Sequence, residues 1–256
     1  MPQKRKILHL ITGLEIGGAE IMLLKTIPSL KNDFEHIVCC IRGRGPIGEK
    51  LAAYDIPVHY LDLQGFLDWR VIPKFHALLQ SKKPDLLITY LIHADLFGRV
   101  FGRIFGVKKI FCSVRVKLVQ AKYFPLLIVD GLTSFLVNQY HFNSQSVAVF
   151  YQKYFFLSKK KITVICNGLD ITKYEISKEA SEHKRQELGL NDKIVLGCLA
   201  KLRAQKGHKY LLEAFHDIHI KHPETALLLI GNGEERQSLE ALTKKIPIGR
   251  FCHFSW

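Results

Sequence analysis

Short apolar segments rich in β-branched residues alternate along this chain with longer amphipathic segments. The short segments, such as Ile7–Thr12 and Leu86–Tyr90, have strand length and are apolar on both faces. Strands alternating with helices indicate an α/β fold with a parallel sheet covered on both sides. The expected strands are Ile7–Thr12, His36–Ile41, Val58–Leu61, Leu86–Tyr90, Lys109–Ser113, Phe135–Val137 and Ile162–Ile165, and the expected helices are Ala19–Leu30, Gly48–Ala53, Val71–Ser81, Ala94–Phe105 and Ser144–Phe156, the last with Ser144 as its N-cap.

A polar, charged segment over residues 171–191 separates this series from a second one. We therefore expect two domains, 1–175 and 176–256. The second has only two expected strands, whereas a self-standing doubly wound domain usually has five or six, so it is expected to be incomplete. Its expected strands are Lys193–Leu199 and Thr225–Ile230, and its expected helices are Ser181–Leu188, Gly207–Ile220 and Glu234–Lys244.

The net charge of +14 favours anionic partners. The residues from Arg99 to Lys122 include Arg103, Lys108, Lys109, Arg115 and Lys117 but no acid, which would suit an anionic membrane surface. The other interpretation is a buried helix and strand with solvated lysines at their ends. Nucleic acid is not expected as a partner, because no recognition motif is present.

No targeting or membrane-spanning segment is expected, since Asp130 and Asn138 interrupt the most apolar stretch, Tyr123–Tyr140. Six scattered cysteines without a Cys-x-x-Cys pair favour buried thiols in a reducing cytoplasm over a zinc site. Four of them lie in strand-like segments: Cys39, Cys112, Cys166 and Cys198.

Two strand-to-helix turns carry candidate chemistry. The first, Thr12-Gly-Leu-Glu-Ile-Gly17-Gly18, would let a phosphate approach the backbone at a helix N-terminus. It lacks the Gly-x-Gly-x-x-Gly spacing, and no acid ends the second strand, so a dinucleotide oxidoreductase is disfavoured. The second turn holds Lys201, Arg203 and Lys206 before a helix, which is an arrangement that suits a diphosphate. A structural turn and a solvated lysine loop are the alternatives.

Five segments in order resemble the family-4 retaining glycosyltransferases of the GT-B fold: GLEIGGAE, NSQSVAVF, ITVICNGLD, LAKLRAQKGHKYLLEAF and LLLIGNGEE. The resemblance covers residues 4 to about 245. It implies a complete N-terminal Rossmann-like domain on the acceptor side and an incomplete C-terminal Rossmann-like domain on the nucleotide-sugar side.

The resemblance also implies site residues. Gly17 and Gly18 match the family's glycine loop, Lys206 matches its diphosphate-binding lysine, and Gly231 and Gly233 match a turn on the donor side. Lys201 stands where the family usually has Arg, so a bidentate contact is lost. His93 resembles a catalytic histidine near the acceptor, and Arg115 is expected to contact a phosphate or the acceptor.

The end of this sequence departs from the family's pattern. Relatives continue with a Glu-x7-Glu element that holds the ribose and the sugar, and this chain instead finishes with GRFCHFSW. We interpret this tail as the result of a frameshift or premature stop. It would expose Phe251, Phe254 and Trp256 unless it packs against another part of the protein. A short variant with an unusual end is the alternative.

The expected function is transfer of a hexose from a sugar nucleotide to a carbohydrate or lipid-linked acceptor in cell-envelope polysaccharide or glycolipid synthesis. The expected location is cytoplasmic, or peripheral on the inner face of the plasma membrane. No metal or other cofactor is expected. Activity is expected to be impaired, because donor contacts are missing. The alternative is a non-catalytic remnant that binds only acceptor or membrane.

Overall fold

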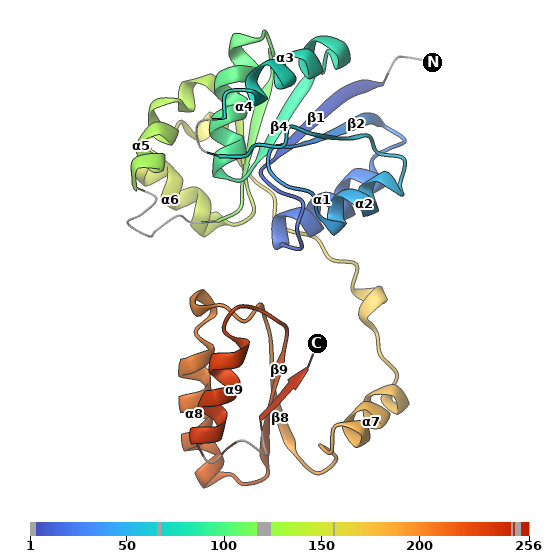
Figure 1. The fold of residues 1–256 in the computed structure, drawn as a ribbon, viewed down its shortest axis with the longest axis vertical. Helices are drawn as coiled ribbons and strands as arrows, with labels where there is room; N and C mark the ends of the chain where they lie inside the picture. Colours follow the sequence, from blue (N-terminus) through green and yellow to red (C-terminus); the bar gives the residue numbers. More distant parts are fainter. Residues whose placement is uncertain are drawn as a thin grey trace. The chain divides into compact units, whose positions relative to one another are not determined.

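The computed structural model of this protein describes residues 4–65, 68–116, 124–155, 157–246, 248 and 252–255. The chain folds as two compact units, Met1–Leu169 and Asp170–Trp256 (Figure 1). Both are α/β units built on parallel sheets, as the alternating pattern predicts.

Among the described residues, the first unit contains a seven-stranded sheet in the order β3-β2-β1-β4-β5-β6-β7, and all neighbouring strands are parallel. Its strands are β1 (Arg5–Ile11), β2 (Phe34–Cys40), β3 (Val58–Tyr60), β4 (Leu86–Tyr90), β5 (Ile110–Val114), β6 (Gln139–Phe142) and β7 (Ile162–Val164). Its helices are α1 (Gly18–Ser29), α2 (Pro46–Ala52), α3 (Val71–Lys82), α4 (Ile92–Ile104), α5 (Phe124–Leu132) and α6 (Gln145–Phe155), with short 3-10 turns at η2 (Ser134–Leu136) and η3 (Lys159–Lys161).

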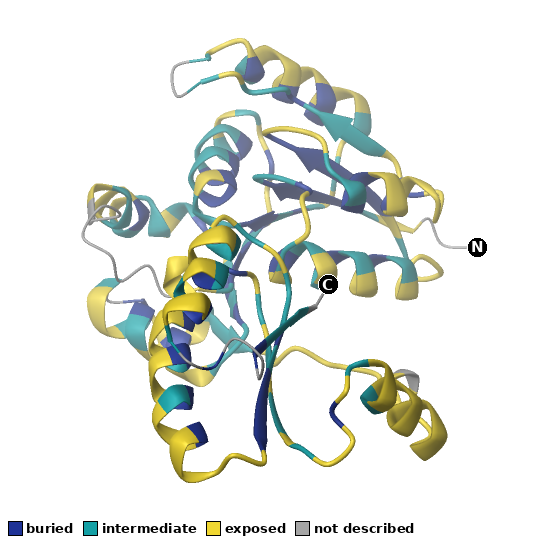
Figure 2. Ribbon diagram, turned by 60° about the horizontal axis from the view of Figure 1, so that its bottom comes forward, coloured by how far each residue is buried: buried dark blue, intermediate teal, exposed yellow. Residues whose placement is uncertain are grey.

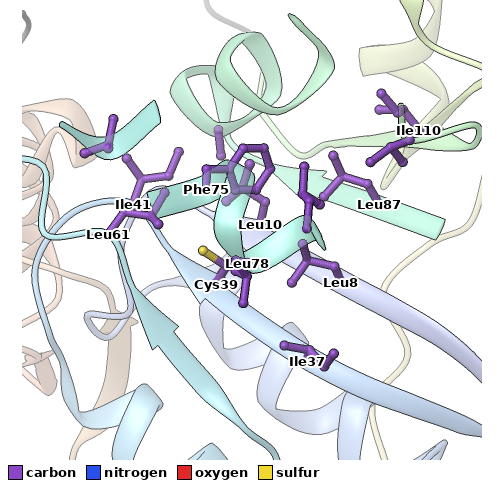
Figure 3. Packing of buried hydrophobic residues seen from close by; sticks show 14 residues of the cluster. Leu8, Leu10, Ile37, Cys39, Ile41, Leu61, Phe75, Leu78, Leu87 and Ile110 are labelled. Carbon is purple, nitrogen blue, oxygen red and sulfur yellow. The ribbon is translucent and has the colours of Figure 1, made fainter. Parts of the chain in front are cut away.

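Strand β1 lies inside this sheet and contributes side chains to a core on each side. Leu8 and Leu10 are fully buried against α3 and α4, where Phe75 packs among them (Figure 3). Ile11 points to the opposite face and packs with Leu23 of α1. Because successive side chains of a strand point to opposite faces, a strand covered on both sides must be apolar at every position. This explains the continuous apolar runs in the sequence.

The second unit contains a smaller parallel sheet in the order β10-β9-β8. Helices α8 and α9 cover one of its faces, where Leu212, Phe215 and Leu239 pack on Leu227 and Leu229 of β9. The outer sides of both helices are exposed (Figure 2). The elements are η4 (Ile171–Tyr174), α7 (Lys178–Glu187), β8 (Ile194–Leu199), η5 (Ala204–Lys206), α8 (His208–Lys221), β9 (Thr225–Ile230), α9 (Arg236–Lys245) and β10 (Cys252–Ser255).

The strand predicted at Phe135–Val137 is wrong. That segment forms the 3-10 turn η2, and the strand β6 begins at Gln139. Tyr140 and Phe142 of β6 are buried and alternate with Gln139 and His141, which are only partly buried. These two polar residues hide the strand in the sequence, although each makes a cross-strand hydrogen bond, to Thr163 and Ser113 respectively.

The exposure expected for the tail is wrong for the residues that the structure describes, while its origin in a frameshift or premature stop stays a prediction. Cys252–Ser255 forms strand β10, parallel to β9, with Phe254 opposite Leu229. Cys252 is buried, and Phe254 packs against the core of α8 and α9. Phe251 and Trp256 lie outside the described residues. The tail therefore extends the sheet.

Two further expectations need correction. Cys39 and Cys112 are buried as expected and Cys198 is half-buried, but Cys166 is exposed, because strand β7 ends at Val164 before reaching it. The basic stretch is not a continuous surface patch in its described part. Arg99 is fully buried, and Arg103 donates hydrogen bonds to the carbonyls of Leu136, Val107 and Lys108.

Lys108 and Lys109 remain as exposed cations of this stretch, and Lys117 and Lys122 lie outside the described residues. The described part thus follows the alternative interpretation, a buried helix and strand with solvated lysines at their ends. Over the described ranges, every helix is too short or too polar to cross a membrane.

Candidate functional site

The glycine loop Thr12–Gly17 follows β1 at the carboxyl edge of the larger sheet and leads into α1. The Thr12 hydroxyl accepts a hydrogen bond from the backbone N–H of Ala94, with 3.3 Å between the two atoms. This contact ties the loop to the first turn of α4. The loop and the start of α4 therefore form one surface at the edge where open α/β sheets bind ligands.

The start of α1 already holds a carboxylate. Gly17 is the N-cap residue, and a Cβ built on it would lie 2.4 Å from Oε2 of Glu20. Glu20 occupies the first helical turn, where a negative charge is favourable. A Cβ on Gly18 would meet open space. An anion could approach Gly17 only if the Glu20 side chain moved aside.

His93 lies in the first turn of α4, beside this loop, and its side chain is exposed. Its pKa lies below the ordinary value, because neighbouring atoms partly desolvate the ring and the Arg42 cation disfavours a second positive charge. The ring is therefore neutral at neutral pH. Leu91, two residues earlier, has φ 71°, a left-handed value that is costly for a residue with a branched side chain.

Arg115 follows β5 at the same edge and is held by two asparagines. Its Nη1 donates to Oδ1 of Asn167 at 2.7 Å, and its carbonyl accepts from Nδ2 of Asn143 at 3.2 Å. Its guanidinium lies 5.9 Å from the centre of the Tyr90 ring. The Nε of Arg115 and the Oδ1 of Asn143 are buried without a hydrogen-bond partner in the described part of the chain. Such unsatisfied polar atoms often mark a place where a ligand or water binds.

In the second unit, the loop between β8 and α8 carries the predicted cations. Lys201, Arg203 and Lys206 are all exposed, and Arg203 lies 3.4 Å from the Glu234 carboxylate across the neighbouring loop. Gly207 caps α8 with φ 69°, which favours glycine at this position. The cations thus surround the N-terminus of a helix, which attracts anions through its unpaired N–H groups.

Gly231 and Gly233 have a packing role that the sequence does not reveal. A Cβ on Gly231 would lie 2.1 Å from the carbonyl oxygen of Ala200, and one on Gly233 would lie 2.2 Å from that of Leu202. Gly231 also has φ 142°. The backbone N–H of Leu202 donates to Asn232 at 3.0 Å. These glycines therefore let the loop after β9 touch the loop that carries Lys201.

The structure thus places the eight predicted residues in two groups. Gly17, Gly18, His93 and Arg115 lie at the carboxyl edge of the larger sheet, and Lys201, Lys206, Gly231 and Gly233 lie at that of the smaller one. Sequence reasoning missed Arg42, Asn143 and Asn167 as part of the first group. Each follows the end of a strand, and this position is the signal that could have identified it.

The surface is also hollowed outside these groups. A hollow of about 550 Å³ lies beyond the end of β3 and is lined by Arg44, Asp62, Gln64, Asp68, Arg70 and Lys74. A larger one of about 820 Å³ lies at the amino edge of the sheet, between the ends of α3 and α4 and the start of β1. Within the described ranges, His, Cys, Asp and Glu side chains do not gather in groups of three or more that could hold a metal ion.

This chain is similar to known glycosyltransferases in sequence and in fold. Residues 180–256 match the family model described as glycosyl transferases group 1. A Staphylococcus aureus protein named capsular polysaccharide biosynthesis glycosyltransferase CapM is 25% identical over 93% of this chain. An Escherichia coli protein named UDP-Gal:alpha-D-GlcNAc-diphosphoundecaprenol alpha-1,3-galactosyltransferase is 23% identical over 93%. This chain spans 64% of the length of each.

The fold of this chain is also similar to that of solved structures. The crystal structure of Anabaena Alr3699/HepE in complex with UDP-glucose superposes with a TM-score of 0.83 over 98% of this chain and 69% of that protein, at 21% identity. This likeness shows the GT-B fold. Together, the comparisons support the group 1 glycosyltransferase family for this chain.

Proposed function

We propose that this chain belongs to a retaining, family-4 glycosyltransferase that transfers a hexose from a sugar nucleotide to a carbohydrate or lipid-linked acceptor. The reaction would serve the synthesis of a cell-envelope polysaccharide or glycolipid. The observation that carries the proposal is the cationic loop at the N-terminus of α8, held by the close packing of Gly231 and Gly233 on its backbone. The proposal is also supported by the similar proteins described above, one of which is named a glycosyltransferase and the other a galactosyltransferase.

In this proposal, Lys201 and Lys206 bind the diphosphate of the donor. Departure of the sugar leaves additional negative charge on that diphosphate, and fixed cations at a helix N-terminus would stabilise it. Lysine is a point charge without the forked geometry of arginine, so Lys201 contributes charge but no bidentate contact. Gly231 and Gly233 contribute by placing the loop.

On the acceptor side, we assign His93 the catalytic contact and Arg115 a contact with a phosphate or the acceptor. The lowered pKa of His93 keeps its ring neutral, so one nitrogen can accept a hydrogen bond from an acceptor hydroxyl. The buried, unsatisfied Nε of Arg115 is a donor that an acceptor oxygen could satisfy. Gly17 and Gly18 would approach the donor once the Glu20 carboxylate has moved aside.

The competing proposal is a protein that binds acceptor or membrane without transferring sugar. Acceptor binding would need only the residues at the carboxyl edge of the larger sheet, such as His93 and Arg115. Anionic membrane contact would have to use Lys108 and Lys109 among the described cations of the basic stretch.

One experiment separates the two proposals. The purified chain is incubated with labelled UDP-glucose, UDP-galactose, UDP-N-acetylglucosamine or GDP-mannose, together with an extract of lipid-linked acceptors, and transferred label is counted. Nucleotide binding is measured in parallel by calorimetry with UDP and GDP. Transfer of labelled sugar by the unaltered chain, and its loss in the Lys206→Ala variant, support the proposal of a glycosyltransferase. Acceptor binding with neither transfer nor nucleotide binding supports the competing proposal.

A further inference from the structure

Helix α5 has its apolar and polar sides reversed relative to an ordinary surface helix. The exposed residues that the structure describes in it have the spacing of one helical face, and all of them are apolar: Pro125, Ile128, Val129 and Leu132. Its one charged residue, Asp130, is buried and pairs with the buried Arg99 of α4. The side of this helix that meets water is therefore its apolar side.

The exposed apolar surface continues beyond the end of α5. Leu132 is 70% exposed, and Phe135 in the next turn, η2, is 73% exposed. Single exposed apolar residues are common on proteins, whereas a group of neighbouring ones often marks an interaction site. We call this group the α5 apolar face, and it consists of Ile128, Val129, Leu132 and Phe135.

A cluster of lysines lies beside the α5 apolar face. The Nζ of Lys161 in η3 donates to the carbonyl oxygens of Phe135 and Val137, at 3.5 and 2.8 Å. These contacts hold η3 against η2. The other two residues of η3, Lys159 and Lys160, are exposed. The end of the apolar face therefore adjoins two solvated cations.

A further cation is held near η2 from the other side. The guanidinium of Arg103 donates to the carbonyl oxygens of Leu136 and Lys108, at 2.8 and 2.6 Å. The Lys108 side chain is exposed. The α5 apolar face thus has lysines near it from two separate loops.

The sequence supplies almost no negative charge to this region. Between Asp95 and Asp170 the only acid is Asp130, whose carboxylate is buried against Arg99. The exposed charges of this segment of the chain are therefore all positive. An apolar face beside exposed lysines is the combination that binds anionic membrane surfaces, because acyl chains accept the apolar side chains and lipid phosphates attract the cations.

We propose that the α5 apolar face and the lysines of η3 bind the surface of a bilayer that contains anionic phospholipids. Leu132 and Phe135 enter the boundary between headgroups and acyl chains, and Lys159 and Lys160 contact the lipid phosphates. Helix α5 has nine residues, far fewer than the roughly 20 that a spanning helix needs. It therefore lies along the membrane surface.

A protein segment fits this surface less well than a bilayer does. A segment that covered the apolar face would have to neutralise the neighbouring lysines, and a second copy of this chain would bring the same positive charges. Anionic lipid supplies the apolar layer and the counter-charge together. The inference identifies where either proposed function would meet a membrane. Its test uses no sugar nucleotide, so its failure leaves the proposal of sugar transfer untouched.

The first test is flotation of the 256-residue chain with vesicles of phosphatidylcholine, either alone or mixed with phosphatidylglycerol. The expected result is binding to the mixed vesicles that weakens as salt rises, and much weaker binding to the neutral ones. Leu132→Asp should weaken binding to the mixed vesicles about tenfold or more. The matched control is Ile220→Asp, at a residue of α8 that is 65% exposed, and it should bind as the unaltered chain does.

The lysines are tested separately from the apolar face. Lys159→Gln and Lys160→Gln should each weaken binding to the mixed vesicles about fivefold and make it less sensitive to salt. Lys50→Gln is the matched control, because Lys50 is an exposed lysine of α2, which contacts β3 at the other end of the sheet. It should leave the binding unchanged.

A fluorescent probe reports whether the apolar face enters the bilayer. The emission of the Phe135→Trp variant should shift to shorter wavelength on the mixed vesicles. Lipids brominated on their acyl chains should quench it more than they quench the unaltered chain. Equal vesicle binding by the Leu132→Asp and Ile220→Asp variants overturns the proposal. So does a dimer in the absence of vesicles that Leu132→Asp dissociates, because a second copy then covers the apolar face.

Discussion

Arg99 of α4 and Asp130 of α5 form a buried ion pair that joins two helices of the larger unit. Arg99 also donates to the carbonyl oxygens of Asp95 and Asp130, at 3.1 and 3.0 Å, and to the Tyr140 hydroxyl at 3.2 Å. A buried charge is tolerated when its partners are complete, as they are here. This guanidinium is therefore a structural group that cannot reach an anionic surface.

Replacing Asp130 by asparagine would leave the Arg99 charge buried without its counter-ion. We expect Asp130→Asn to lower the free energy of unfolding by about 3–5 kcal/mol. The measurement is urea unfolding followed by circular dichroism. Glu187→Gln is the control, since Glu187 pairs with Lys184 on an exposed face of α7, and no measurable change is expected there. Equal effects of the two substitutions would contradict the structural role of the buried pair.

Adding one methyl group at Gly231 would force apart the two loops of the second unit. We expect Gly231→Ala to destabilise that unit by at least about 2 kcal/mol, because the left-handed φ is strained for alanine and the Cβ meets the Ala200 carbonyl. Hydrogen exchange at Leu202, whose N–H bonds to Asn232, reports the change directly. Gly168→Ala should be silent, because a Cβ there meets open space. Unchanged exchange at Leu202 would refute the packing role.

Lys206 is expected to contribute to nucleotide affinity through a charge-assisted hydrogen bond to the diphosphate. We predict that Lys206→Ala weakens UDP binding about tenfold or more, which corresponds to the loss of one charge-assisted hydrogen bond. Calorimetry measures the affinity. Lys209→Ala is the control, because Lys209 is an exposed lysine of the same helix that lies 3.9 Å from Glu213. If the two variants bind UDP equally well, the loop is not the diphosphate site.

His9 should make the larger unit sensitive to acid. Its ring is buried between Tyr90 and His36, at 3.0 and 2.9 Å, and burial, with a smaller contribution from His36, lowers its pKa to about 3. The unfolded chain therefore binds a proton on His9 that the folded chain does not, between about pH 6.5 and 3. Stability contributed by neutral His9 is complete above pH 6.5 and is lost as the pH falls through this window.

Urea titrations at a series of pH values measure this loss, which should reach a few kcal/mol, since one pKa unit corresponds to about 1.4 kcal/mol. His9→Gln can still hydrogen-bond but cannot take up a proton, so its acid slope should be flatter than that of the unaltered chain. His183→Gln, at an exposed residue of α7, serves as the comparison. An unchanged slope in His9→Gln would show that this histidine does not control acid stability.

The sequence predicts the sheet of the larger unit correctly where a strand is buried on both faces. Short, continuous apolar runs such as those of β1 and β4 are typical of such strands. It fails for β6, where Gln139 and His141 form cross-strand hydrogen bonds and break the apolar run. It fails for β10 as well, since this four-residue strand is defined by its pairing with β9 and by the packing of Cys252 and Phe254 on the core of α8 and α9.

For the candidate site, glycines and cations that follow a strand could be recognised from the sequence alone, because position along the strand fixes the edge at which they lie. Contacts between separate loops could not. The two asparagines around Arg115 depend on how separate loops pack, since they lie 28 and 52 residues away from it in the chain. Arg99 shows the same limit, since a basic stretch in sequence gives no indication of which cation will be buried.

Among the described strands, the two sheets also differ in the longest stretch of chain that a pairing must close. Lys6 at the start of β1 bonds to Asp85 beside β4, 79 residues away. At the start of β8, Lys193 bonds to Pro223, only 30 residues away. Longer loops lose more entropy on closure, and contacts distant in sequence slow folding. The meeting of β1 with β4 should therefore limit the folding rate of the larger unit, while β8 and β9 pair early.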